Sequence, residues 1–192
     1  MIGNSKFFMQ KKVIFTIIIV IIVVAGFAAY LYRHKDSSQP YNIVYNVLPS
    51  EYSKLIQAEN KSIFYLAKDG KRYIFPNQGT FKSWFGDYTL IRQISNDELF
   101  KIPLGGNVFY RPGSKILQTA SDPKYYFVNL NGVLSPFDSE YTIKDVYGSD
   151  WKKQVEEIEN FYFTNYKIGN EIYSVSDLPL IPENITIDQN NF

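Results

Sequence analysis

The sequence contains no cysteine and only one histidine, His34, among its 192 residues. The lack of cysteine excludes disulfides, thiolate metal ligands and cysteine nucleophiles. The lack of a second histidine leaves Ser-His-Asp and Cys-His catalytic sets, and the common zinc ligand sets, unavailable. His34 closely follows a long apolar run, so we interpret it as a flanking residue rather than as a catalyst.

Phosphate-binding and calcium-binding patterns are absent as well. The pair Gly105-Gly106 lacks the neighbours of a P-loop or a dinucleotide fingerprint, and the acidic residues do not follow a calcium-loop spacing. No cofactor, metal site or catalytic residue is therefore predicted. Carboxylates of the kind that a glycosidase uses are present, but nothing in their spacing selects two of them. The candidates by residue type are Asp87, Asp97, Glu98, Glu156, Glu157 and Glu159.

One long apolar run lies near the N-terminus. Residues 13–32 contain no charged side chain, and a helix of that length spans about 30 Å, the thickness of a bilayer's hydrocarbon core. The run predicts a transmembrane signal anchor at 13–33, with the lipid bilayer as its partner, behind a short basic cytoplasmic leader at 1–12. A cleaved signal peptide is the alternative, although its apolar core usually has roughly 7–15 residues. The reversed topology also stays open.

Charge is distributed unevenly along the chain. Residues 1–35 carry five Lys or Arg and no Asp or Glu, whereas the remainder carries 15 basic and 19 acidic residues. An acidic remainder argues against nucleic acid as a partner. We expect this remainder to lie on the outer side of the cell membrane, after a tether formed by residues 34–52.

An internal repeat occupies most of the remainder. Residues 53–113 and 114–177, called repeat 1 and repeat 2 below, match at their turn glycines and apolar residues. The turn Asp69-Gly70 corresponds to Asn131-Gly132, 62 residues later, and a two-residue insertion near Trp151 then lengthens the spacing to 64. The pairs matched after the insertion are Ile91 and Val155, Ile94 and Ile158, Leu99 and Phe163, Gly105 and Gly169, and Val108 and Ile172.

Each repeat predicts the same order of elements. Runs of Tyr, Phe, Ile and Val predict antiparallel strands around the Asp-Gly or Asn-Gly hairpin turn. Apolar residues at i, i+3 and i+4 predict a short helix next, and a last strand is expected at 107–110 and at 171–174. The predicted fold class is α+β: an N-terminal transmembrane helix, then two tandem repeats of antiparallel hairpin or meander plus short helices. Residues 178–192 are expected to form a loose C-terminal extension.

Six short motifs follow one another in and after repeat 1. They are Lys71 to Pro76, Phe81 to Gly86, Ile94 to Leu99, Pro103 to Gly105, Arg111 to Gly113, and Asp122 to Lys124. Their combination resembles an uncharacterised tandem repeat of predicted bacterial secreted and membrane-anchored surface proteins. Repeat 2 departs from it, because Leu134-Ser135-Pro136 replaces Arg72-Tyr73-Ile74. The resemblance implies a cell-surface setting and no reaction or ligand.

Aromatic residues, 17% of the chain, are the remaining indication of function, since an exposed Tyr or Trp can stack on a sugar ring or hold a partner. Trp151 lies in the insertion that breaks the repeat spacing, and Arg111 lies in the turn between the repeats. We predict these two as candidate ligand contacts, with core packing and turn bracing as the respective alternatives. The insertion and the seam between the repeats are the places where a site is expected.

The predicted function is that of a non-enzymatic, membrane-anchored extracytoplasmic module of a bacterium. It would bind a cell-envelope polymer such as cell-wall glycan, or a surface protein. One alternative is an accessory subunit of a membrane complex, whose anchor helix makes the contacts. Another is a carboxylate-dependent glycan hydrolase.

Overall fold

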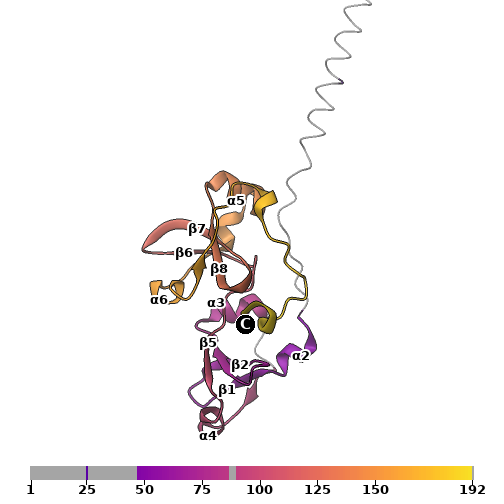
Figure 1. The fold of residues 1–192 in the computed structure, drawn as a ribbon, viewed down its shortest axis with the longest axis vertical. Helices are drawn as coiled ribbons and strands as arrows, with labels where there is room; N and C mark the ends of the chain where they lie inside the picture. Colours follow the sequence, from indigo (N-terminus) through magenta and orange to yellow (C-terminus); the bar gives the residue numbers. More distant parts are fainter. Residues whose placement is uncertain (1–24, 26–46, 87–89, 192) are drawn as a thin grey trace, which may run out of the picture. The chain divides into compact units, whose positions relative to one another are not determined.

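The computed structural model describes residues 25, 47–86 and 90–191. The chain divides into two compact units, 1–39 and 40–192, and all described residues except Ala25 belong to the second. Within that unit the described strands form two five-stranded sheets, one in each repeat (Figure 1).

The sheet of repeat 1 has the strand order β4-β1-β2-β3-β5. Its strands are β1 (Leu55–Gln57), β2 (Ile63–Leu66), β3 (Arg72–Ile74), β4 (Arg92–Gln93) and β5 (Leu104–Asn107). The central strand β2 is antiparallel to both of its neighbours, β1 and β3. The outer strands are parallel to their neighbours, because β4 pairs with β1 and β5 pairs with β3 in that direction.

The sheet of repeat 2 has the order β10-β8-β7-β6-β9. Its strands are β6 (Ile116–Thr119), β7 (Asp122–Val128), β8 (Val133–Pro136), β9 (Val155–Glu157) and β10 (Lys167–Ile168). Taken from β9, this order repeats that of the first sheet taken from β4. Here too the outer strands β9 and β10 are parallel to their neighbours.

The predicted fold class is wrong as stated. The fold is α+β, but both sheets are mixed rather than antiparallel. A chain that passes through a helix between two strands can return in the same direction, and such helices lie between β3 and β5 and between β8 and β10. The described strands of the two repeats form two separate sheets.

The transmembrane part of that prediction has no support. In the part of the chain that the structure describes, no helix combines the length and the apolarity that crossing a membrane requires. The predicted helix at 13–33 lies outside the described residues, apart from Ala25. The predicted leader at 1–12 and residues 34–46 of the predicted tether lie outside them too.

Short helices connect the strands. They are α2 (Pro49–Tyr52), α3 (Gln78–Trp84), α4 (Asn96–Phe100), α5 (Glu140–Tyr147), α6 (Asn160–Phe163), α7 (Ile187–Asn191) and three 3₁₀ turns, η1 (Leu130–Gly132), η2 (Trp151–Gln154) and η3 (Val175–Asp177). Side chains of Asn77, Ser95 and Ser139 accept a backbone N–H at the starts of α3, α4 and α5. These caps satisfy N–H groups that a helix leaves unpaired.

The two hairpin turns differ in type. An Asp-Gly or Asn-Gly hairpin turn predicts type I′, and Asn131 and Gly132 both have the positive φ that this type requires, 59° and 64°. In the turn Asp69-Gly70 of repeat 1, Gly70 has positive φ and Asp69 does not, and the Gly70 N–H donates to the Ala67 carbonyl. That geometry is a three-residue loop whose last residue is left-handed, so the type I′ prediction is wrong for Asp69-Gly70.

Each sheet is buried on both faces. Neighbouring residues of one strand enter different core clusters: Leu55 and Ile56 of β1 do so in repeat 1, and Ile116 and Leu117 of β6 in repeat 2. Because successive strand residues point to opposite faces, both faces need cover. Helix α3 covers one face of the first sheet and α4 the other. Helices α5 and α6 cover the second sheet in the same way.

The C-terminal segment is not a loose extension. It runs back from repeat 2 to repeat 1 (Figure 1, yellow). There Ile185 and Ile187 join the core cluster that contains Trp84, and Asp188 and Asn190 are buried. The prediction of a loose extension rested on the prolines and asparagines of this segment. In the structure, Ile185 and Ile187 pack into the core of repeat 1 and Asp188 binds Lys54.

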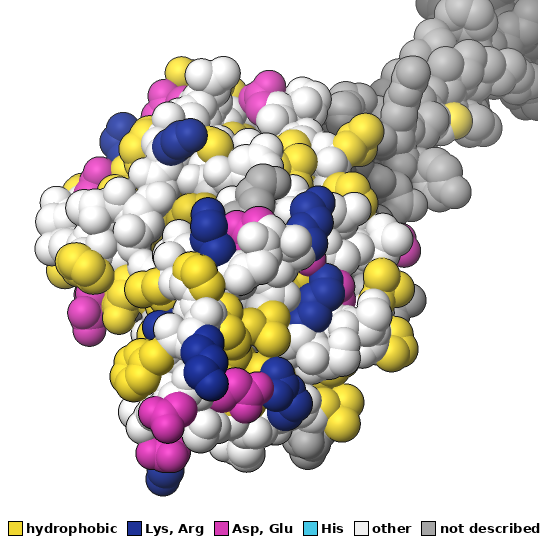
Figure 2. All heavy atoms as spheres, turned by 60° about the horizontal axis from the view of Figure 1, so that its bottom comes forward, with side chains coloured by type: hydrophobic (Ala, Val, Ile, Leu, Met, Phe, Trp, Pro, Cys, Tyr) yellow, Lys and Arg dark blue, Asp and Glu magenta, His cyan; other side chains and the backbone are white. Residues whose placement is uncertain are grey.

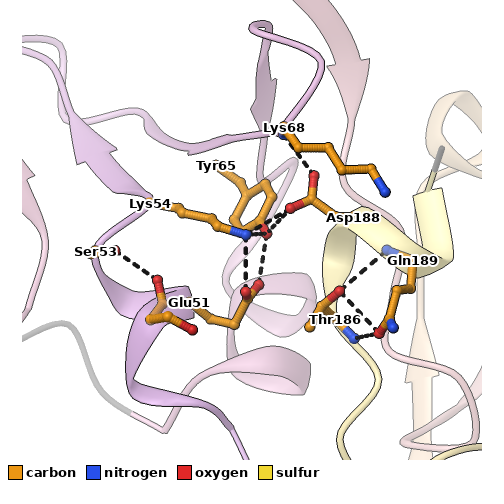
Figure 3. A network of polar contacts seen from close by, with 9 residues as sticks. Glu51, Ser53, Lys54, Tyr65, Lys68, Thr186, Asp188 and Gln189 are labelled. Carbon is orange, nitrogen blue, oxygen red and sulfur yellow. Dashed lines mark hydrogen bonds and ion pairs between the residues drawn. The ribbon is translucent and has the colours of Figure 1, made fainter.

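A polar network fastens α7 to repeat 1 (Figure 3). Lys54 donates from Nζ to Asp188 Oδ2 at 2.7 Å and to Glu51 Oε1 at 3.0 Å. The Tyr65 hydroxyl lies 2.6 Å from Glu51 Oε2 and 2.9 Å from Asp188 Oδ2. The second oxygen of Asp188 accepts the Lys68 N–H at 2.8 Å. Both carboxylates are buried, so this network compensates their loss of hydration.

The charges of the network follow from these contacts. Burial alone would raise the pKa of Asp188, but the bonds from Lys54, Lys68 and Tyr65 outweigh it and hold that pKa below 3.8. Burial alone would lower the pKa of Lys54, and its carboxylate partners raise it instead. Asp188 therefore stabilises the fold fully above about pH 4, and this contribution is lost as the pH falls through its lowered pKa.

Replacing Asp188 tests this network. We expect Asp188→Asn to lower the free energy of unfolding at pH 7 by about 3 kcal/mol, the low end of the range for breaking a buried pair, because the Lys54 side chain is 31% exposed. The measurement is urea unfolding at pH 7 and at pH 3, and the difference from wild type should shrink at pH 3. The control is Asp150→Asn, whose ion pair with Lys153 is exposed and contributes about 0–1 kcal/mol. Equal losses in the two variants would contradict the assignment.

Candidate functional site

Trp151 lies in the core of repeat 2. Its side chain is 1% exposed, and its ring contacts that of Tyr125 edge-on with centroids 5.0 Å apart. The insertion forms the turn η2, which directs the indole into the same cluster as Val146. Val146 occupies the position of Trp84 in repeat 1, so Trp151 supplies the large ring that repeat 2 lacks there. The indole is thus not presented to a ligand in solution.

Arg111 is also buried. Its guanidinium carbon lies 5.4 Å from the ring centroid of Trp84, and Nη2 donates to the Glu183 carbonyl at 2.9 Å. Its backbone N–H donates to Ser83 Oγ at 3.0 Å. Arg111 therefore joins helix α3 to the C-terminal segment, which is the bracing role that the sequence left as the alternative.

Truncating Trp151 should destabilise the protein. We expect Trp151→Ala to lower the free energy of unfolding by about 3–5 kcal/mol, since it removes a buried indole and leaves a cavity. Phe161→Ala is the matched control, because that aromatic ring is exposed and its loss should stay within about 0.5 kcal/mol. Denaturant unfolding of both variants checks this. A loss below about 1 kcal/mol for Trp151→Ala would refute its packing role.

The seam between the repeats depends on two close approaches. The Phe109 ring packs on the backbone of Gly132, where a Cβ would collide with it. The same ring lies against Tyr166 with centroids 4.8 Å apart, and the Tyr110 N–H donates to the Tyr166 hydroxyl at 3.0 Å. A Cβ on Gly79 would collide with Glu156 of repeat 2. Bare backbone at both glycines lets the repeats pack closely.

A hollow of about 250 Å³, called the seam hollow below, opens beside this contact. Its lining comes from repeat 1, repeat 2 and the C-terminal helix. The lining residues are Tyr73, Gly105, Gly106, Asn107, Phe109, Asn165 and Asn191.

A larger hollow of about 520 Å³, called the distal hollow below, lies in repeat 2. Its lining is formed by Asn129, Val133, Ser135, Gly169, Asn170, Glu171, Ile172, Tyr173 and Asp177.

The two hollows occupy equivalent places in the repeats. The spacing of 62 relates Tyr73 to Ser135, and the spacing of 64 relates residues 105–109 to residues 169–173. Both hollows therefore lie along or just after the outer parallel strand, which is β5 in repeat 1 and β10 in repeat 2. The repeat thus builds the same recess twice from different side chains.

The surroundings of the two hollows differ. Repeat 2 and helix α7 border the seam hollow through Asn165 and Asn191. In repeat 2 the positions equivalent to Gly79 and Phe109 are Tyr141 and Tyr173, whose side chains are 71% and 66% exposed. A tyrosine in the place of Gly79 would block the close approach that the first seam uses. The distal face is therefore open and unsuited to stacking a further repeat in the same way.

Tyr173 is held at the rim of the distal hollow. Its backbone N–H donates to Asp177 Oδ2 at 3.0 Å. Its hydroxyl donates to Glu171 Oε2 at 2.9 Å, and this bond raises the pKa of Tyr173. Inside the hollow, the Asn129 amide lies 3.5 Å from the buried Ser135 hydroxyl. The site thus combines one positioned aromatic ring with amide, hydroxyl and carboxylate groups.

Among the described residues, no three or more His, Asp and Glu side chains gather as metal ligands would. Hydrogen bonds lower the pKa values of Asp69, Asp122 and Asp188, and none of these three carboxylates lines the distal hollow. The arrangement at the distal hollow is suited to binding.

A comparison of the chain with protein-family models, with curated proteins and with solved structures gives no match. The resemblance to a bacterial surface repeat therefore stays a prediction. Residues 169–173 are not marked as a site by the sequence, because the repeat alignment matches only Gly169 and Ile172 there. The signal that could have found them is the pair of tight glycines, Gly105 and Gly169, at the same place in both repeats.

Proposed function

We propose that this protein is a non-enzymatic binding module whose ligand is a hydroxyl-rich saccharide polymer, taken up at the distal hollow. The observation that carries the proposal is the exposed ring of Tyr173, held by hydrogen bonds beside a polar recess. The neighbouring groups are an amide at Asn170, a carboxylate at Glu171 and a hydroxyl at Ser135.

The chemistry of these groups matches that of a sugar. The face of a sugar ring carries C–H groups that pack on an aromatic ring, while its hydroxyls both donate and accept hydrogen bonds. Tyrosine offers an apolar face together with a polar tip, and an amide side chain offers donors and an acceptor side by side. A volume of about 520 Å³ falls within the usual range of ligand pockets, roughly 300–1,000 Å³.

The distribution of charge favours an uncharged or amino-bearing polymer over an anionic one. Repeat 2 carries six Lys or Arg and ten Asp or Glu, whereas repeat 1 carries nine and five. The lining of the distal hollow includes Glu171 and Asp177 and no cation. Figure 2 brings forward the bottom of Figure 1, where β1, β2 and α4 of repeat 1 lie. Lys and Arg side chains stand there among hydrophobic ones.

The alternatives fit these observations less well. A glycan hydrolase would need both carboxylates of the hollow, and Asp177 already accepts two backbone N–H groups and the Ser174 hydroxyl. An accessory role in a membrane complex would place the contacts on residues outside the described ones. A surface protein as ligand remains an outcome of the test, and the position outside the cytoplasm remains a prediction.

Removing the Tyr173 ring tests the proposal. We expect the full chain, kept soluble with mild detergent, to co-sediment with isolated peptidoglycan or to bind cellotetraose or chitotetraose in solution. Tyr173→Ala should weaken that binding about tenfold or more, which corresponds to about 1.4 kcal/mol for the lost stacking contact. Isothermal titration calorimetry measures the soluble probes, and sedimentation measures the polymer.

Tyr141→Ala is the matched control, since that tyrosine is equally exposed in the same repeat but does not line the hollow. Unchanged binding by Tyr173→Ala, or an equal loss in both variants, would count against the distal hollow. Absence of binding by the wild-type chain to all of these saccharides would remove the saccharide proposal.

A further inference from the structure

We infer that the seam hollow is a second subsite for the same class of ligand, specific for an uncharged sugar unit. This inference rests on the proposed function, because it extends saccharide binding from the distal hollow to its structural equivalent. The seam hollow is lined by aromatic rings, glycine backbone and asparagine amides, and by no Lys, Arg, Asp or Glu side chain.

The amides of the seam hollow are available to a ligand. No hydrogen bond within the described part of the chain uses the side chains of Asn107 or Asn165. The backbone carbonyl of Asn107 accepts the side-chain amide of Asn191 at 3.1 Å. Asn165 is exposed to solvent. Two amides at one recess present paired donors and acceptors, which is what neighbouring sugar hydroxyls require.

The aromatic walls of the seam hollow are fixed before any ligand arrives. The Tyr73 ring lies so close to Gly105 that a Cβ there would collide with it, and its hydroxyl donates to Asp69 Oδ2 at 2.8 Å. Phe109 is held between Gly132 and Tyr166. A wall that does not have to be ordered on binding lowers the entropic cost of the complex.

The size of the seam hollow suits a single sugar unit. Its volume is about half that of the distal hollow, 250 Å³ against 520 Å³. Its lining comes from three parts of the chain, since Asn107 belongs to repeat 1, Asn165 to repeat 2 and Asn191 to helix α7. The subsite is therefore complete only when the C-terminal helix is in place, which gives the polar network around Asp188 a role in binding.

Amide NMR of the isotope-labelled full chain in detergent, titrated with cellotetraose and with chitotetraose, tests the inference. We expect two groups of shifting signals in the wild-type chain, one from residues 105–107 and one from residues 170–173. Asn165→Phe, which places a ring in the seam hollow, should abolish the first group and leave the second within about twofold of its wild-type affinity. Asn165→Ala should weaken the first group about fivefold.

Tyr173→Ala provides the reciprocal variant and should remove only the second group. Asn184→Ala, an exposed asparagine outside both hollows, is the control and should change neither group. Shifts confined to residues 170–173 in the wild-type chain would overturn the seam subsite and leave the proposed function standing. A wild-type chain with no shifts at either hollow would overturn both.

Discussion

The packing of Phe109 on the bare backbone of Gly132 is the contact on which the rest of the structure depends. It brings a side chain of repeat 1 onto the backbone of repeat 2, where the same ring also lies against Tyr166. The C-terminal helix α7 then closes one side of the seam, where Asn190 accepts the Asn131 N–H. A Cβ at Gly132 would collide with the Phe109 ring, so any larger residue there requires this contact to shift.

The surroundings of the recess differ between the two repeats because the chain around it differs. In repeat 1 the recess is bordered by a following repeat and by α7. In repeat 2 the equivalent recess is lined by residues of that repeat, and Tyr141 stands where the first seam has Gly79. One glycine-to-tyrosine difference thus separates a face that packs against protein from a face that stays open to solvent. The opposite charge balance of the two repeats adds to this division, because the open recess is the acidic one.

Local patterns in the sequence predicted a large part of the fold. The hairpin strands and the short helices follow from propensity and side-chain period, which act within a few residues. The parallel outer strands were not predictable in the same way, since β4 and β5 reach their neighbours only after intervening helices. The candidate site shares this limit: Trp151 and Arg111 were chosen by type and position, and both lie buried in the structure, whereas Tyr173 gave no local signal.

The sequence by itself determined that this chain has no cysteine chemistry, that it contains one unit twice, and that each unit combines strands with short helices. Composition and spacing suffice for such statements, because these properties do not depend on which segments contact one another in the fold. The tertiary structure alone decided which aromatic rings are buried, where α7 docks and which recess is open. These properties arise from contacts between residues far apart in the chain, such as Lys54 with Asp188, and no pattern of neighbouring residues records them.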